Sequence, residues 1–146
     1  MSNNIRIGKV SSVDYGRGMI KVVYPDKDGA VTDDLPYISM NDEYKMPEVG
    51  KNVLVLHLSN GSAAGVVMGS YWNQGNIPPE TGSALFRKEF GKVFGEAFLR
   101  YASGEVRIYG PSIVFQSGSG GISVAQLISD HERIGQLEKR VSALGG

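Results

Sequence analysis

The residues NVLVLHL at 52–58 and AGVVMG at 64–69, with Asn60-Gly61 between them, are the part of the chain that decides the fold. Asn-Gly between two apolar runs is a strong hairpin signal, because both residues tolerate the positive φ angles of a tight turn. The first run is apolar at nearly every position, which is typical of a strand buried on both faces. We therefore predict a β-hairpin that contributes four residues to the core: Val53, Val55, Val66 and Met68.

Three further strands are predicted before this hairpin. Residues 5–13 alternate imperfectly and contain Gly8, which predicts a bulge or a sharp bend. Residues 19–24 form a second strand, and residues 31–40 form a weaker third one, in which Pro36 favours an edge position. Five short strands with bends favour a five-stranded barrel of the OB type over residues 1–78. A generic small β-sandwich remains the alternative.

The composition narrows the class of protein. The 146 residues include 15 Lys and Arg and 15 Asp and Glu, so the formal net charge is zero, whereas proteins that grip nucleic acid usually carry a basic excess. The absence of cysteine excludes disulfides, thiolate metal sites and Cys nucleophiles. The N-terminal residues have no apolar signal core, and no apolar run approaches the roughly 18 residues of a membrane helix. We expect the chain to be made and folded in the cytoplasm.

The middle of the chain is predicted to be a linker followed by short β segments. Residues 71–82 contain Pro78-Pro79 and show no periodicity, and residues 83–121 contain short apolar stretches separated by glycines. Each stretch is too short to enclose a core within one chain, whereas stacked or intertwined copies would enclose one. We assign residues 79–121 to this linker and to a β segment that needs further copies to enclose a core.

The last segment, residues 122–146, is predicted to be a helix preceded by a flexible joint at 118–121. Ser123 and Gln126 have the spacing of a capping box. Apolar residues then recur in a heptad pattern that is typical of a self-associating helix, although Asp130 and Gly135 weaken it. The positions of the seam are Leu127, Ile134, Leu137, Val141 and Leu144. The alternative is an ordinary amphipathic helix lying on the barrel.

Four stretches in the first half resemble the phage baseplate assembly protein V family. IGKVSSVD at 7–14 resembles the Gly-x-Val-x-x-Val-Asp start of that family, and GMIKVVYP at 18–25 resembles its second strand with the Tyr-Pro ending. MPEVGKNVLV at 46–55 resembles its Pro-x-x-Gly step into a buried strand, and GVVMGSYW at 65–72 resembles its closing strand. The resemblance covers about residues 5–80, with the four stretches in the right order.

This resemblance implies a homotrimeric central spike of a contractile phage tail or phage-tail-like particle. Members of the family are trimers with an OB-type domain followed by an intertwined β-helical needle, which corresponds to residues 79–121 here. In such a trimer the five seam residues of the helix would form a trimer interface. The implied partners are the baseplate hub and tail tube proteins, and the spike contacts the target cell envelope on contraction. Many members end in a His-x-His iron site. Because only His57 and His131 are present and they lie far apart in the sequence, we expect no iron-binding tip. Since a helix makes a blunt end, either a separate tip protein caps it or the helix is itself a docking element.

No group of residues in the sequence has the pattern of a catalytic or metal site, so we expect no enzymatic activity and no cofactor. Two other functions remain open. One is an OB-type oligonucleotide-binding module, and the other is a carbohydrate-binding tail component in which Tyr71 and Trp72 stack on a sugar. The candidate residues for nucleic-acid binding are Tyr15, Arg17, Lys21 and Tyr24.

Overall fold

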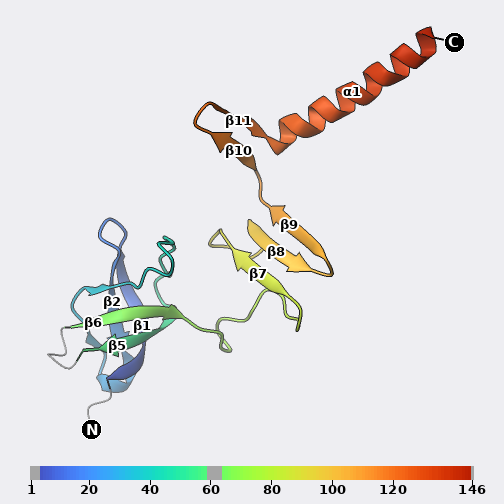
Figure 1. Ribbon diagram of the computed structural model, residues 1–146. Helices are drawn as coiled ribbons and strands as arrows, with labels where there is room; N and C mark the ends of the chain where they lie inside the picture. The colour runs from blue at the N-terminus through green and yellow to red at the C-terminus, as the bar shows by residue number, and fades with distance from the viewer. Residues whose placement is uncertain (1–3, 59–63, 146) are drawn as a thin grey trace. The chain divides into compact units, whose positions relative to one another are not determined.

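The computed structural model of the chain describes residues 4–58 and 64–145 (Figure 1). The protein is mainly β with one C-terminal helix, as the sequence predicts. It divides into two compact units, Met1–Pro78 and Pro79–Gly146. The predicted turn at 59–62 lies outside the described residues.

The first unit is built on one antiparallel sheet in the order β3-β2-β1-β5-β6, with β4 paired to β2. Its elements are β1 (Ile5–Asp14), β2 (Met19–Tyr24), the short 3-10 helix η1 (Pro25–Lys27), β3 (Ala30–Val31), β4 (Leu35–Pro36), β5 (Asn52–His57) and β6 (Gly65–Ser70). The single strand predicted over 31–40 is therefore wrong, because the chain forms two strands of two residues there. Between them the Thr32 hydroxyl accepts the backbone N–H of Val22 at 3.0 Å, in place of a backbone carbonyl.

The segment after β4 connects two parts of this sheet that are distant along its strand order. Tyr37 N donates to Gly18 O at 3.0 Å, beside the start of β2. Tyr37 also forms a parallel bridge with Val67 of β6, whose carbonyl accepts the N–H of Ile38 at 2.9 Å. The segment is thus hydrogen-bonded to both β2 and β6.

The core of the first unit confirms two of the four predicted hairpin residues. Val53 and Val55 are fully buried, but Val66 is only half-buried and Met68 is 43% exposed. The reason is the register, in which Val55 pairs with Val67 and Leu54 pairs with Gly69, so that Met68 is the extra residue of a bulge. The residues that form the core are Val10, Ile20, Val22, Tyr24, Leu35, Val53, Val55 and Val67.

Gly8 is needed for close packing, and the prediction that it marks a bulge is wrong. The irregularity in β1 lies at Ser11, between the pairs Val10–Val22 and Ser12–Lys21. A Cβ at position 8 would overlap the side chain of Val22 and lie 2.9 Å from Cδ1 of Tyr24. The missing side chain therefore lets β2 approach β1.

The second unit contains a three-stranded antiparallel sheet, a hairpin and a helix. The sheet has the order β7-β8-β9, with β7 (Phe86–Glu89), β8 (Phe98–Ala102) and β9 (Glu105–Tyr109). The hairpin consists of β10 (Val114–Ser117) and β11 (Gly120–Ser123), and α1 (Val124–Leu144) follows it directly. The flexible joint predicted at 118–121 is wrong, because Ser117 and Gly120 pair across the hairpin turn and β11 continues into the helix.

The start of α1 agrees with the predicted cap. Ser123 Oγ accepts the N–H of Gln126 at 3.1 Å, which satisfies one of the unpaired donors of the first turn. The Gln126 side chain does not return to Ser123 but donates to Asp130 Oδ1 at 3.0 Å, so only half of a capping box forms. In the part of the chain that the structure describes, no helix combines the length and the apolar character needed to cross a membrane.

Candidate functional site

The second unit has no buried core of its own. None of the residues 79–145 is buried, whereas the eight buried hydrophobic residues of the described chain all belong to the first unit. A small sheet or hairpin is marginal in water unless it covers an apolar face, because ordering its backbone costs about 1–2 kcal/mol per residue. The large apolar side chains exposed before the helix are Phe86, Phe90, Val93, Phe94, Tyr101, Val106, Ile108, Tyr109, Val114, Phe115 and Ile122.

One face of the three-stranded sheet carries much of this apolar surface. Phe86 pairs with Tyr101, which pairs with Val106, and Leu99 pairs with Ile108, so these side chains share one face. Val106, in the edge strand β9, is 66% exposed. We call this surface the apolar face, and its members are Phe86, Lys88, Leu99, Tyr101, Val106 and Ile108.

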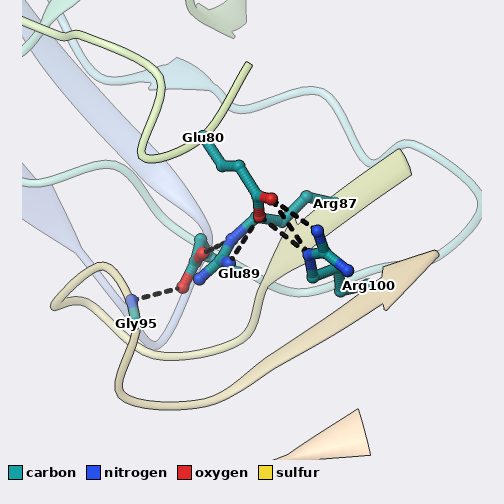
Figure 2. A network of polar contacts seen from close by, with 5 residues as sticks. All are labelled: Glu80, Arg87, Glu89, Gly95 and Arg100. Atoms are coloured by element: carbon teal, nitrogen blue, oxygen red, sulfur yellow. Dashed lines mark hydrogen bonds and ion pairs between the residues drawn. The ribbon is translucent and has the colours of Figure 1, made fainter. Parts of the chain in front are cut away.

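The opposite face of the same sheet is closed by polar contacts from within the chain. Figure 2 shows Glu80 in contact with Arg87 and Arg100, which are paired across β7 and β8. Arg100 Nη2 donates to Glu80 Oε1 at 2.7 Å and Arg87 Nη1 donates to Glu80 Oε2 at 3.1 Å. Glu89 accepts from Arg87 Nε and from the backbone N–H of Gly95 (Figure 2). We call these five residues the arginine network.

The electrostatics of the arginine network favour its charged form. The side-chain hydrogen bond from Arg100 lowers the pKa of Glu80 from 4.5 to about 2, with a further contribution from Arg87. The Arg87 guanidinium also lies 3.8 Å from the centre of the Phe98 ring, and Phe98 stacks on Tyr109. The network face is therefore satisfied by this chain itself, while the apolar face is left without a cover.

The predicted seam residues lie on a helix that is exposed along its length. No residue of α1 is buried, and the exposed fraction is 43% at Leu127 and 68% at Val141. The other three predicted positions, Ile134, Leu137 and Leu144, are exposed as well. Ile128, on the flank of this stripe, is also exposed. The stripe of apolar residues is therefore uncovered in the single chain.

A further apolar surface lies on the outside of the sheet in the first unit. Ile5 pairs with Leu56, and Ile7 pairs with Leu54, so the four side chains share the face of β1 and β5 that points away from the core. A shallow groove of about 320 Å³ is lined by Ile7, Leu54 and Met68 together with residues 69–71. The sequence already indicates this surface, because successive side chains of a strand point to opposite faces and residues 52–58 are apolar at nearly every position.

The two histidines belong to different units of the chain. His57 Nε2 lies 2.7 Å from the hydroxyl of Tyr24, at the edge of the core of the first unit. His131 is exposed on α1 in the second unit. Among the described residues there is no group of three or more His, Cys, Asp or Glu side chains placed to hold a metal ion.

The residues considered for nucleic-acid binding do not form one exposed surface. Tyr24 is buried in the core, and burial raises the pKa of its hydroxyl. Arg17 is held by Asp14 and by Asp34, each at 2.7 Å, while Tyr15 and Lys21 are exposed. Tyr15 is therefore the one exposed aromatic residue among these four, because Tyr24 is not available for stacking.

The aromatic pair considered for sugar binding is accessible. Trp72 is 57% exposed and Tyr71 is 36% exposed. The backbone carbonyl of Tyr71 accepts bonds from the side chains of Asn73 and Asn76, which fix the turn after Trp72.

Comparison of the sequence with protein-family models and with curated proteins gives no match.

Proposed function

We propose that this chain is a structural spike protein that acts as a homotrimer in the baseplate of a contractile phage tail or phage-tail-like particle. The observation that carries the proposal is the second unit, in which residues 79–145 expose a run of aromatic and aliphatic side chains and bury none. Such a unit gains its stability when further copies cover these side chains, because each large apolar residue contributes roughly 1.5–3 kcal/mol on burial.

The hydrogen bonding of the first unit supports an OB-type barrel. The antiparallel sheet runs β3-β2-β1-β5-β6, and the Tyr37–Val67 bridge links the segment after β4 back to β6 in parallel. A five-stranded Greek-key barrel needs such a link between the third strand segment and the last strand. The four sequence stretches that resemble the baseplate assembly protein V family all fall within this unit.

The two faces of the β7-β8-β9 sheet support an arrangement around a common axis. The apolar face would point inward, where three copies cover one another, and the arginine network would point outward. Inter-chain pairing would also protect the edges of a short sheet. In this arrangement folding is coupled to assembly, which suits a part that has to resist compression when the sheath contracts.

The partners follow from the same proposal. The spike is made in the host cytoplasm and assembled beneath the tail tube, where it contacts the hub and tube proteins. A separate tip protein that binds at α1 is a further candidate partner. On contraction it would pierce the target envelope. Its action is mechanical, with no enzymatic step and no cofactor. Because Tyr24 is buried and Arg17 is paired, a nucleic-acid-binding role has little support.

A carbohydrate-binding tail component is the second candidate, and the exposure of Trp72 favours it. Aromatic rings that stay exposed beside a turn with fixed geometry are suited to stacking on a sugar. A glycan array with the full chain tests this role, with Trp72→Ala as the control variant. Binding that is lost in Trp72→Ala would support it, and absence of binding would eliminate it.

The mass of the full chain in solution tests the spike proposal directly. Light scattering at micromolar concentration should give three times 15.7 kDa. A monomeric mass, with the second unit folded, would refute the proposal, because the exposed apolar surfaces would then need no copies.

A further inference from the structure

We infer that α1 associates with its copies in parallel and in register, and that Arg133 of one helix forms an ion pair with Glu138 of the next. The inference rests on the proposed homotrimer and adds to it the direction, the register and the partner residues of the helical contact. It is carried by the charges that flank the exposed apolar stripe.

The flanks of the stripe differ in charge. With Leu127, Ile134 and Val141 at the a positions of the heptad, Leu137 and Leu144 fall at d. The e flank, which follows d, then carries His131 and Glu138. The g flank, which precedes a, carries Gln126, Arg133 and Arg140.

Only the parallel direction brings opposite charges together. In parallel helices a g residue faces the e residue of the following heptad in the neighbour, which places Arg133 opposite Glu138 and Gln126 opposite His131. In antiparallel helices like flanks meet, so the g flanks would bring Arg133 and Arg140 of two chains side by side. Such like-charge contacts are unfavourable. The charge pattern therefore selects the parallel direction.

The proposed ion pair has no equivalent within one chain. Residues three or four apart are neighbours on a helix, whereas Arg133 and Glu138 are five apart and lie on opposite flanks of the stripe. The Arg133 side chain is 75% exposed, and its ion pair with Asp130 is long at 3.9 Å. Arg133 therefore remains accessible to a neighbouring helix.

Asp130 fixes the register. It occupies the d position of the first full heptad, where its carboxylate accepts the side-chain N–H of Gln126 at 3.0 Å. In-register association places the three Asp130 side chains in one layer near the start of the helix. A shift of one heptad would place Asp130 in the layer of Leu137, where a carboxylate lacks polar partners. A single polar core position is a known determinant of register, at a cost in stability.

Single-cysteine variants test the direction and register, because the natural chain has no cysteine. Val141→Cys places the thiol in the seam near the end of α1, and Ser129→Cys, on the outer side of the helix, is the control. Under mild oxidation we expect Val141→Cys to form covalent dimers within each trimer, while Ser129→Cys stays uncross-linked. Absence of the Val141→Cys disulfide, or equal cross-linking of both variants, would overturn the inference.

Charge reversal tests the ion pair. Glu138→Arg should lower the melting temperature of the helix signal by several degrees. Residues 134, 135, 141 and 142, which are the neighbours of Glu138 on its own helix, carry no charge, so the loss would come from a contact with another chain. Arg133→Glu should also lower it, and the double variant should recover most of the loss. Reversal of Glu132 and Lys139, on the outer face, is the matched control and should show no such recovery. Additive losses in the double variant would overturn the ion pair.

These outcomes are separate from those of the proposed function. A trimeric mass without the disulfide and without the recovery would leave the spike standing and reject only the helical contact. A monomeric mass would reject both.

Discussion

The guanidinium of Arg100 in β8 donates to the carboxylate of Glu80, with 2.7 Å between Nη2 and Oε1. Arg100 Nε is also within 2.9 Å of Glu80 Oε2, so the contact is bidentate. Glu80 precedes the first strand of the sheet by several residues, and this contact ties that segment to the middle strand. Bidentate pairs of this kind are geometrically specific as well as strong.

Stability of the second unit should therefore fall on acidification. The pKa of Glu80 is lowered from 4.5 to about 2 by the Arg100 hydrogen bond, so its contribution is complete above about 4.5 and is lost as the pH falls toward 2. We expect the melting temperature of the natural chain to decrease across this window. Glu80→Gln should melt lower at neutral pH and show a shallower decrease. Parallel pH curves for the two chains would contradict the assignment.

The apolar face should be required for assembly. Val106→Lys combined with Ile108→Lys places two charges on it, where burial without a partner costs several kcal/mol per charge. We expect the trimeric mass to be lost. Arg107→Gln is the matched control, because Arg107 lies between the two on the opposite face and forms an exposed ion pair with Glu105 at 2.7 Å. A trimer that survives the double change would show that another surface holds the copies together.

The fold could be predicted from the sequence where the pattern is local. The sequence correctly predicts the Ser123 cap and a helix after it, since a cap and a periodic stripe are both short-range signals. The sequence does not predict which side chains of β6 point into the core, because the bulge at Met68 depends on pairing with β5. Two apolar residues in succession, Val66 and Val67, gave no indication of which one points inward.

The candidate site was only partly predictable for the same reason. The exposed apolar stripe of α1 follows from heptad spacing within one element, and its role as a seam between copies stays a prediction. The apolar face and the arginine network could not be predicted, because they arise from cross-strand register, which brings Arg87 beside Arg100 and Glu80 to both. Long-range pairing of this kind leaves no fixed spacing in the sequence.

The close approach at Gly8 gives a prediction for the first unit. Gly8→Ala should lower the free energy of unfolding by roughly 1–3 kcal/mol, because the added Cβ would overlap Val22 and approach the Tyr24 ring. Chemical denaturation followed by Trp72 fluorescence measures the change. Gly16→Ala is the control, since a Cβ there meets only the Asp14 carboxylate at an ordinary 3.6 Å. Equal stability of Gly8→Ala and the natural chain would mean that β1 and β2 are less closely packed than the structure shows.

The last prediction concerns Asp130, the one charged residue among the core positions of the helical stripe. Asp130→Leu should raise the melting temperature of the helix in the trimer. The change removes a layer of three carboxylates and adds a Leu side chain that contributes roughly 1.5–3 kcal/mol per chain when buried. It loses the bond from the Gln126 side chain and the long ion pair with Arg133, which are exposed contacts worth only about 0.2–0.5 kcal/mol each. Interaction of Asp130 with the helix dipole is small, because the residue lies beyond the first turn.

Ser129, on the outer side of α1, is the control position for Asp130. Ser129→Leu adds a similar apolar side chain on the outer side of the helix, where it should leave the melting temperature of the trimer unchanged or lower it. If Asp130→Leu melts no higher than Ser129→Leu, position 130 does not face the other helices. The seam would then be wrong in register, and the Arg133–Glu138 pair would have to be reassigned with it. The pattern of disulfide cross-linking is a second measurement on Asp130→Leu. If the variant melts higher and also cross-links at positions other than 141, then Asp130 holds the helices in a single alignment and lowers their stability in doing so.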